Sequence, residues 1–340
     1  MAEKNVTITD IARLATVSKK SVSRVLNDEP GVSEKTREHI RNIIAETGYQ
    51  PDRRARALAG QGSYLLALAY NNRNPAYVLD LLQGALEEAN RLGFEIILHP
   101  VDVAVDQAPA DLVRLMRRSG ADGLILTPPL SESFHMFEGF RAIERPIVRV
   151  AGDDVASPIP QISFDDRAAA FAITNLILSH GDKDIAFIGG TKDSGPTRRR
   201  LAGFKDALLA QQCEIRPDWQ VYGDFTFLSG IEAGTHLLGR EKRPQAIMCC
   251  NDEMAAGVLQ SARAEGLRVP DNLSVTGFDD APIAQQVWPP LTTVRQPLQE
   301  IGVAAVKQLV ALIRDEDAEK IQSSFSHGLV ERSSVAYRHS

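Results

Sequence analysis

Lys19, Lys20 and Ser21 stand together in a stretch of residue types that could contact DNA. The surrounding residues 7–27, TITDIARLATVSKKSVSRVLN, have the apolar spacing of a helix, a break and a second helix. In a helix-turn-helix the first turn of the second helix lies in the major groove, and these three side chains would occupy that turn. The pattern is equally typical of a small three-helix bundle with a solvated charged face, so both interpretations remain open here.

Three short helices would position this turn. We expect Thr9, Ser18 and Ser33 to cap them, because hydroxyl oxygens accept the free amide hydrogens of a first helical turn. Residues 16–18 interrupt the apolar pattern and predict the turn between the first two helices. The predicted inward-facing residues are Ile11, Ala12, Leu14 and Ala15 in the first helix, Val22, Val25 and Leu26 in the second, and Val32, Ile40, Ile43 and Ile44 around the third.

The charge of the chain is unevenly distributed. It has 38 basic and 44 acidic residues and a net charge of −6, which is not typical of a protein that binds nucleic acid. Residues 1–60 contain 11 basic and 8 acidic residues, so this segment carries +3 and the remainder carries −9. A basic head on an acidic body attracts phosphates at one end and repels the polyanion elsewhere.

Length and composition limit the class of protein. A chain of 340 residues, 44% of them hydrophobic, can form a small head and a two-lobed body. No apolar run approaches the roughly 20 residues of a membrane span, and the N-terminus lacks an apolar signal segment, so we expect a cytoplasmic protein with no membrane partner. Cys213, Cys249 and Cys250 form no CxxC motif, which predicts reduced core cysteines.

The segment between head and body, GYQPDRRARALAGQGS at 48–63, carries several arginines. Gly48 should end the third helix, and Asp52 can cap a short helix over 53–59. A helix this short is unstable alone, but it could fold when DNA supplies phosphates and a groove. The side chains available for these contacts are Arg53, Arg54, Arg56 and Leu58. A flexible linker is the alternative.

The body alternates buried strands with helices, which predicts parallel sheets flanked by helices. Seven strands of this kind are enough for two sheets. The predicted strands are residues 65–70, 95–100, 123–128, 146–151, 185–190, 246–251 and 273–280. Helices between them include residues 77–92, 166–180, 197–211, 228–239 and 253–265.

Polar side chains follow several of these strands. They are Asn71, Asn72, Arg73 and Asn74 after the first strand, Thr127 after the third, Asn251 and Asp252 after the sixth, and Asp279 and Asp280 after the seventh. Because ligands of parallel α/β sheets bind beyond the carboxyl ends of the strands, the sequence predicts a binding cleft at these ends.

The whole chain resembles the lactose-repressor (LacI/GalR) family of bacterial transcription regulators. The resemblance covers nearly all of residues 5–335. It is carried, in the family's order, by the motifs IARLATVSKKSVSRVLN, VSEKTREHI, GYQP, RALAG, RRLAGF, CNDEMAAG, SVTGFDD and PPLTTVRQP. It implies an α/β fold with an all-α helix-turn-helix head and a two-lobed body like the periplasmic sugar-binding proteins.

The resemblance also implies a domain division. The head would span 1–48 and the hinge helix or linker 49–62. The N-terminal lobe would be 63–163 with 295–325, and the C-terminal lobe 164–294 with 326–340, so that the chain crosses between lobes near residues 163, 294 and 325.

For DNA, the resemblance places Lys19, Lys20 and Arg24 where the family reads base edges. Lys and Arg suit the N7 and O6 acceptors of guanine, so we expect half-sites that contain G in a pseudo-palindromic operator on double-stranded DNA. Leu58 matches the leucine that the family inserts into the minor groove. The full predicted DNA-binding set is Thr7, Ser18, Lys19, Lys20, Ser21, Ser23, Arg24, Asn27, Arg53, Arg56 and Leu58, in which Thr7, Ser18, Ser23 and Asn27 would bind phosphates or cap helices.

Two residues depart from the family pattern. Thr16 stands at a turn position that is usually Gly, and a left-handed backbone there costs a β-branched residue roughly 1 kcal/mol. Asp52 stands where the family generally has Asn, which adds a negative charge near phosphates, although its value as a cap can offset the repulsion.

For the effector, the resemblance implies a sugar in the cleft between the lobes. The predicted effector-binding residues are Tyr77, Thr127, Ser194, Arg200, Phe225, Asn251, Asp279, Trp288 and Gln296. A carboxylate can accept from two hydroxyls, arginine and asparagine donate, and aromatic rings stack on a pyranose face.

Some of these residues have structural alternatives. Residues 251–252 could cap the helix that follows, which we expect to be the main role of Asp252. Trp288 could serve lobe packing alone. We expect Arg149 to pair with Asp153 or Asp154 rather than to reach the cleft.

The motifs of an enzyme are incomplete. Gly190 and Gly195 have the spacing of a phosphate loop, but residues 196–197 are Pro-Thr where Lys-Ser/Thr is needed. The histidines lack metal-binding spacing, and no Ser lies in a G-x-S-x-G elbow. In the pairs 165–166 and 279–280, adjacent carboxylates point apart, so we expect one ligand and one cap in each. The sequence therefore predicts no enzyme, no cofactor and no metal.

A solute receptor for a transporter would fit the body alone, but the basic head argues against it. We expect a homodimer rather than a coiled-coil tetramer, because VAYRHS at the C-terminus has no apolar heptad. A sugar that shifts one lobe against the other would change the spacing of paired heads and so alter operator affinity, as inducer or as co-repressor.

Overall fold

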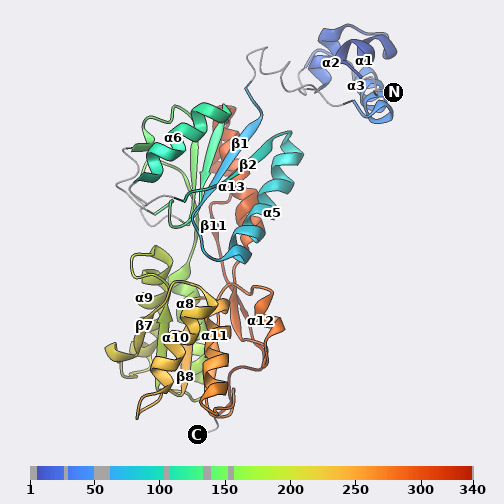
Figure 1. Cartoon of the computed structure of the whole chain (residues 1–340). Helices are drawn as coiled ribbons and strands as arrows, with labels where there is room; N and C mark the ends of the chain where they lie inside the picture. The colour runs from blue at the N-terminus through green and yellow to red at the C-terminus, as the bar shows by residue number, and fades with distance from the viewer. Residues whose placement is uncertain are drawn as a thin grey trace. The chain divides into compact units, whose positions relative to one another are not determined.

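A computed structural model describes residues 6–26, 30–49, 62–102, 107–132, 139–151 and 157–338. The chain divides into two compact units, residues 1–64 and 65–340, and each is described by itself. We call them the head and the body (Figure 1).

Within residues 6–26 and 30–49, the head contains three helices with defined caps. They are α1 (Ile8–Leu14), α2 (Lys19–Leu26) and α3 (Glu34–Thr47). Ser18 and Ser33 cap α2 and α3 as predicted, and Gly48 ends α3 with a left-handed backbone. The expectation that Thr9 caps α1 is wrong.

Thr7 caps α1 instead, because Asp10 lies three residues later and completes a capping box. The Thr7 hydroxyl accepts from the backbone N–H of Asp10, and the Asp10 carboxylate accepts from the backbone N–H of Thr7. The carboxylate near the helix N-terminus is also favoured by the helix dipole.

The three helices bury one small core. Ile11, Val22 and Ile40 are fully buried at its centre, and Tyr49 closes one side. Most of the predicted inward-facing residues belong to this core, but Leu14 does not: it is 51% exposed in the chain. The core leaves the start of α2 exposed at Lys19 and Lys20.

The turn between α1 and α2 has the backbone strain that its sequence predicts. Thr16 has φ +55°, in the left-handed region, and its amide donates to the carbonyl of Arg13. A β-branched residue in this conformation costs roughly 1 kcal/mol relative to glycine.

The first lobe of the body is built on a six-stranded parallel sheet in the order β11-β5-β4-β3-β1-β2. Its strands are β1 (Leu65–Tyr70), β2 (Glu95–Pro100), β3 (Gly123–Leu126), β4 (Ile147–Val150), β5 (Gln161–Phe164) and β11 (Ser324–Phe325). The helices that flank it are α5 (Pro75–Leu92), α6 (Ala108–Ser119) and α13 (Leu298–Ile313). Helices α5 and α13 pack side by side, and α6 covers the other face (Figure 1).

Small residues allow α5 and α13 to approach closely. A Cβ atom built on Gly84 would lie 1.9 Å from the backbone oxygen of Gln299, and one on Gly302 would lie 2.2 Å from the backbone oxygen of Leu81. These two glycines therefore set the distance between the helices.

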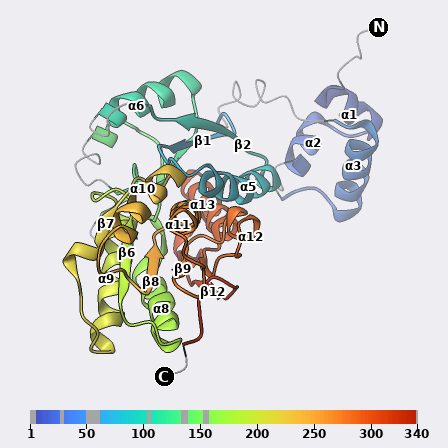
Figure 2. The ribbon, with the colours of Figure 1, turned by 60° about the horizontal axis from the view of Figure 1, so that its bottom comes forward.

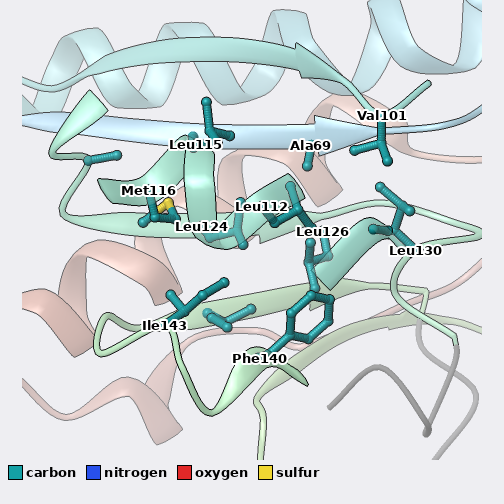
Figure 3. Close-up of a cluster of buried hydrophobic side chains, with 14 residues drawn as sticks. Ala69, Val101, Leu112, Leu115, Met116, Leu124, Leu126, Leu130, Phe140 and Ile143 are labelled. Carbon is teal, nitrogen blue, oxygen red and sulfur yellow. The ribbon is translucent and has the colours of Figure 1, made fainter. Parts of the chain in front are cut away.

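The face of this sheet that α6 covers holds a compact apolar core, shown in Figure 3. Leu112 and Leu115 of α6 pack with Leu124 and Leu126 of β3, and Phe140 closes the cluster from a later segment. The core holds the carboxyl ends of β1 and β3 in a fixed position beside each other.

The second lobe contains a four-stranded parallel sheet in the order β7-β6-β8-β9. Its strands are β6 (Ile185–Gly189), β7 (Gln220–Tyr222), β8 (Ala246–Cys249) and β9 (Ser274–Thr276). The elements around it are α8 (Asp166–Ser179), α9 (Gly195–Ala210), η2 (Pro217–Trp219), α10 (Phe227–Leu238), α11 (Asp252–Ala264) and α12 (Ile283–Gln286). Helices α8 and α9 pack together, as do α10 and α11 (Figure 2).

The chain passes between the two sheets more than once. After β5 it enters α8. After β10 (Thr293–Arg295) it returns to the first sheet with α13, η3 (Ala318–Lys320) and β11, and it then leaves with β12 (Gly328–Val330). Strands β10 and β12 pair antiparallel beside each other. Each lobe is thus assembled from separate stretches of the chain.

The seven strands expected in the body are present, with bounds that differ by a few residues. The sequence pattern does not predict β5, β7, β10, β11 or β12, which have two to four residues each. Strands this short carry too few apolar positions for a periodic signal. Cys249 and Cys250 are buried and free, whereas Cys213 is only half-buried, so its expected core position is wrong.

Candidate functional site

A cavity of about 690 Å³ lies in the body where strands of both sheets end. Residues 71–74 reach it directly after β1 and Pro128, Pro129 and Glu132 after β3, while Thr191, Asp193 and Ser194 reach it after β6. Parallel strands bring their carboxyl ends to one edge of a sheet, which explains why segments so distant in sequence meet here. The other described lining residues are Tyr77, Ala151, Asp166, Pro196, Arg198, Arg200, Asp224, Phe225, Asp279 and Gln296.

Asp279 lies at the centre of a hydrogen-bonded group in this cavity. Its backbone is left-handed, with φ +111°, and its carboxylate accepts from Gln296 Nε2 at 2.6 Å and from Asn74 Nδ2 at 3.0 Å. Burial raises the pKa of the Asp279 carboxyl to about 7, although the Arg200 guanidinium and the Gln296 amide act in the opposite direction. The carboxyl is thus poised to change charge near neutral pH.

Arg200 is buried beside Asp279 and is held on several sides. Its Nε donates to Asp166 Oδ1 at 2.7 Å, its Nη1 donates to the backbone oxygen of Cys250, and the guanidinium lies 3.6 Å from the centre of the Phe278 ring. Burial opposes the charge of Arg200, but the carboxylates of Asp166 and Asp279 outweigh it and raise the pKa of the guanidinium. Arg200 is therefore a fixed cation with a rigid orientation.

Tyr77 supplies an aromatic ring and a hydroxyl to the same wall. It belongs to α5, whose N-terminus is capped by Asn74: the Asn74 side-chain oxygen accepts from the backbone N–H of Ala76 and of Tyr77. Burial, and then the Asp166 carboxylate, raise the pKa of the Tyr77 hydroxyl. The hydroxyl therefore stays neutral and can donate a hydrogen bond at any physiological pH.

Several contacts join the two lobes across the cavity. Arg73 Nη1 donates to Asp224 Oδ2 at 2.7 Å. The backbone N–H of Gly195, at the start of α9, donates to Glu132 Oε2 at 3.0 Å. With the bond from Asn74 to Asp279, these contacts link the segments after β1 and β3 to the second lobe.

The structure brings six of the nine predicted effector-binding residues to the cavity wall: Tyr77, Ser194, Arg200, Phe225, Asp279 and Gln296. Thr127 and Asn251 are buried behind the wall, where the Thr127 hydroxyl donates to the carbonyl of Ala69 and Asn251 Nδ2 donates to the carbonyl of Phe225. Trp288 is not part of the wall and is 88% exposed, so it serves neither the cavity nor lobe packing in this chain.

The expected role of Asp252 as a helix cap is wrong. Asn251 is the N-cap of α11, since its side-chain oxygen accepts from the backbone N–H of Met254 at 3.0 Å. Asp252 accepts from the backbone N–H of Ala281 at 2.7 Å and from the Thr293 hydroxyl at 2.6 Å. The buried Asp252 carboxylate thus ties the segment after β9 to the strand β10.

The two carboxylate pairs divide their roles. Asp165 caps α8 by accepting from the backbone N–H of Ala168, while Asp166 lines the cavity. Asp280 binds Arg295 and Arg332, while Asp279 lines the cavity. In the first pair this is the division expected from sequence. In the second pair, Asp280 forms ion pairs with two arginines instead of the helix cap expected from sequence.

Arg149 does not reach the cavity wall. Its guanidinium donates to the backbone oxygens of Ser131 and Ile159 and to the side chain of Gln161. Its predicted partners Asp153 and Asp154 lie outside the described residues.

Sequence reasoning missed some residues of the wall. The sequence predicts no site role for Glu132 or Asp224, and it marks residues 71–74 as a polar cluster without an effector role. Polar residues directly after apolar strands were the available signal for Asn74. Glu132 lies several residues beyond β3, and Asp224 follows β7, a three-residue strand too short to be predicted from the sequence, so that signal is absent for both.

The exposed start of α2 in the head is the second candidate site. Lys19 and Lys20 are exposed, whereas Ser21, Ser23 and Arg24 are half-buried. Ser18 and Thr7 accept backbone hydrogen bonds as caps. Four predicted DNA-binding residues, Asn27, Arg53, Arg56 and Leu58, lie outside the described residues, as does Asp52.

Two other site types find no support in the described ranges. Among these residues, no His, Cys, Asp and Glu side chains gather in a group that could hold a metal ion. Within the same residues, no helix has both the length and the apolar character needed to span a bilayer.

A three-helix head with a basic second helix, joined to a two-lobed parallel α/β body with a cavity at its strand ends, defines a class of transcription regulator. A family model described as bacterial regulatory proteins, lacI family, matches residues 7–52, and one described as periplasmic binding protein-like domain matches residues 174–335. The chain belongs to the lacI family, and it is a transcription regulator.

Curated relatives match over almost the full chain. Catabolite control protein A of Priestia megaterium is 32% identical over 97% of this chain and 99% of its own. The probable HTH-type transcriptional repressor ExuR of Bacillus subtilis strain 168 is 32% identical over 93% of this chain and 95% of its own. These relatives are regulators rather than enzymes.

Solved structures show the same fold. A lac repressor dimer bound to operator and the anti-inducer ONPF is 28% identical, with a TM-score of 0.78 over 98% of this chain and 100% of that one. A complex of the transcriptional regulator CelR with cellobiose is 28% identical, with a TM-score of 0.74 over 97% of this chain and 99% of that one.

Proposed function

We propose that this protein is a sequence-specific repressor of a carbohydrate-utilisation operon, whose operator affinity is controlled by a sugar bound in the body cavity. The observation that carries the proposal is the group around Asp279. A buried carboxylate, a fixed guanidinium and a neutral phenol converge on one cavity, and together they offer the acceptors and donors that sugar hydroxyls need.

The sugar would lie between Asp279 and Arg200, with an aromatic ring against its apolar face. Phe225 lines the cavity, has a left-handed backbone at φ +67° and packs its ring against Gly190. Tyr77 offers a second ring. The CelR structure contains cellobiose, which supports a saccharide as the ligand class for this chain.

The head would bind double-stranded DNA through α2. Lys19 and Lys20 are exposed in its first turn, where they can reach guanine N7 and O6 in the major groove, and Arg24 extends the same helix. We further propose that Arg53, Arg56 and Leu58 contact DNA from a hinge helix. A pseudo-palindromic operator follows if two heads bind together.

The active form would be a homodimer, as in the lac repressor structure. Trp288 is 88% exposed and Leu228 is 69% exposed, and covering them in a dimer would remove apolar surface from water. We assign both to the subunit interface. W288A and L228A should then weaken the dimer in sedimentation velocity; a dimer constant unchanged in both variants contradicts this assignment.

The lobe boundaries expected from the sequence form part of the proposal: 63–163 with 295–325 for one lobe and 164–294 with 326–340 for the other. The segments that connect them include β10, to which Asp252 ties the cavity loop. A sugar that moves Asp279 would thereby bias the relation of the lobes, and the coupling to DNA needs a differential affinity of a few kcal/mol.

The DNA part is tested by selecting binding sites from random duplexes and measuring affinities at each operator position. K20A should relax the base preference at one position per half-site. K35A removes the same charge from the exposed N-terminal turn of α3 and is the matched control, which should leave the preference intact. A K20A profile identical to that of the unmodified chain refutes the assignment of Lys20.

The effector part is tested by thermal-shift screening of monosaccharides and disaccharides. A specific sugar at 100 times its Kd should stabilise the protein by about 2.7 kcal/mol. The same sugar should change operator affinity in a fluorescence anisotropy titration, and D279N should abolish that change. A panel in which no sugar alters operator binding refutes the proposed control.

A further inference from the structure

The carboxylate of Glu132 lies at the N-terminus of helix α9, across the cavity from its own lobe. Its Oε2 accepts from the backbone N–H of Gly195 at 3.0 Å, and its Oε1 lies 3.9 Å from Nη2 of Arg199. The Glu132 side chain is only 6% exposed. An anion supplied by the protein thus occupies the start of a 16-residue helix.

The start of α9 is a position where an anion is expected. Free backbone N–H groups and the positive end of the helix dipole favour negative charge there. Ser194, the N-cap residue, makes no side-chain capping bond, so the first turn receives no cap from its own chain segment. Glu132 supplies the negative charge at this helix N-terminus from the opposite wall, by accepting from the backbone N–H of Gly195.

The guanidiniums of the wall are also engaged. Arg200 binds Asp166 and the carbonyl of Cys250, Arg73 binds Asp224, and Arg198 Nη1 donates to the carbonyl of Asp193. The described lining residues include five carboxylate side chains against three guanidiniums. An incoming anion would therefore meet a wall of net negative charge, in which each guanidinium already binds at least one protein acceptor.

We propose that Glu132 is a specificity-determining residue: its carboxylate fills the position where a carboxylate or phosphate of a ligand would bind, so that the cavity accepts uncharged sugars and rejects sugar acids and sugar phosphates. This proposal rests on the proposed function only in taking a sugar as the ligand. The exclusion of anions itself is a property of the cavity and can be measured without sugar or DNA.

Inorganic phosphate is the probe, titrated by calorimetry into the full-length protein at constant ionic strength set with chloride. Three variants are compared with the unmodified chain. E132Q keeps the size of the side chain, E132A vacates the position, and E144Q removes a charge from an exposed glutamate of the same lobe. Phosphate bound by the head is common to all four proteins and cancels in the comparison.

E132A should bind phosphate at least tenfold more tightly than the unmodified chain, and E144Q should match the unmodified chain. E132Q tests the charge separately, because its amide oxygen can still accept from Gly195 while the negative charge is gone. Its phosphate affinity should lie between that of the unmodified chain and that of E132A. In E132A combined with R199A, the gained affinity should disappear, which places the phosphate at the start of α9.

Equal phosphate affinity in E132A and the unmodified chain overturns the proposal, as does a gain that survives R199A. A second arm compares glucose with glucuronate and glucose 6-phosphate on the unmodified chain; tighter binding of either anion than of glucose also overturns it. Failure of the proposed function would be seen instead as sugar-independent operator binding, which leaves the phosphate comparison unaffected.

Discussion

The buried carboxyl of Asp279 should make the stability of the body depend on pH, and Asp279→Asn should remove that dependence. An ordinary aspartate carboxyl has a pKa of 3.8, whereas burial raises that of Asp279 to about 7. Between these two values the unfolded chain has lost the proton that the folded chain retains. Stability from this group is therefore fully present below pH 3.8 and is lost progressively as the pH rises from there through 7.

The size of the effect follows from the two pKa values. Relative to acid pH, the raised pKa of Asp279 lowers the free energy of unfolding by about 2 kcal/mol at pH 5, where only the unfolded chain has ionised, and by about 4 kcal/mol at pH 8. Asparagine has the same shape but does not titrate. It leaves one of the buried donors of Asn74 and Gln296 without an acceptor, a loss of about 1–3 kcal/mol. D279N should thus be close to neutral at pH 5 and stabilising by about 2 kcal/mol at pH 8.

Urea denaturation without effector, at pH 5 and pH 8, measures this difference. The fluorescence of Trp219, which is buried in the second lobe, reports unfolding of that lobe, and an unchanged m-value shows that the same surface unfolds in both proteins. A difference between D279N and the unmodified chain that is the same at both pH values refutes the reasoning.

Three further outcomes are expected. Thr16→Gly should stabilise the head by less than about 1 kcal/mol, because it relieves the backbone strain at φ +55° but adds conformational freedom to the unfolded chain. Hydrogen exchange of the head amides measures this difference. Slower exchange in the threonine form than in the glycine form contradicts it. Gly84→Ala should destabilise the body by about 1–3 kcal/mol in urea denaturation, because the new Cβ would lie 1.9 Å from the Gln299 backbone oxygen. A stabilised variant would show that α5 and α13 can move apart without cost. Arg73→Ala should lower the free energy of unfolding by less than about 1 kcal/mol in the same assay, because the Arg73 side chain is 70% exposed where it pairs with Asp224. A larger loss would mean that this ion pair controls the contact between the lobes.

The parts of the fold that the sequence predicts are those with local signals. Apolar runs such as residues 65–70 are long enough to identify buried strands, and Gly48 marks a helix end by its backbone freedom. The Thr7 cap was missed although Asp10 three residues later supplies the second half of a capping box. The two-residue strand β11 carries no local signal, since its identity depends on pairing with β5, 160 residues earlier.

The candidate site divides in the same way. Asp279 and Arg200 were found from family motifs, and the structure places both in the cavity wall. Glu132 was missed because its contact with Gly195 joins residues 63 positions apart in different lobes. Trp288 was placed in the cleft because an aromatic residue suits a sugar ring, but residue type says nothing about which way a loop faces.

The return of the chain to its first sheet has a consequence for synthesis. Helix α13 packs against β3, β4 and β5, and β11 completes the sheet at the edge of β5. This part of the sheet is therefore not covered until residues 298–325 have been synthesised. While the ribosome makes the second lobe, an apolar face of the first remains open to solvent and to chaperones. We therefore expect the first lobe to reach its final structure only after residues 298–325 have been made, late in translation.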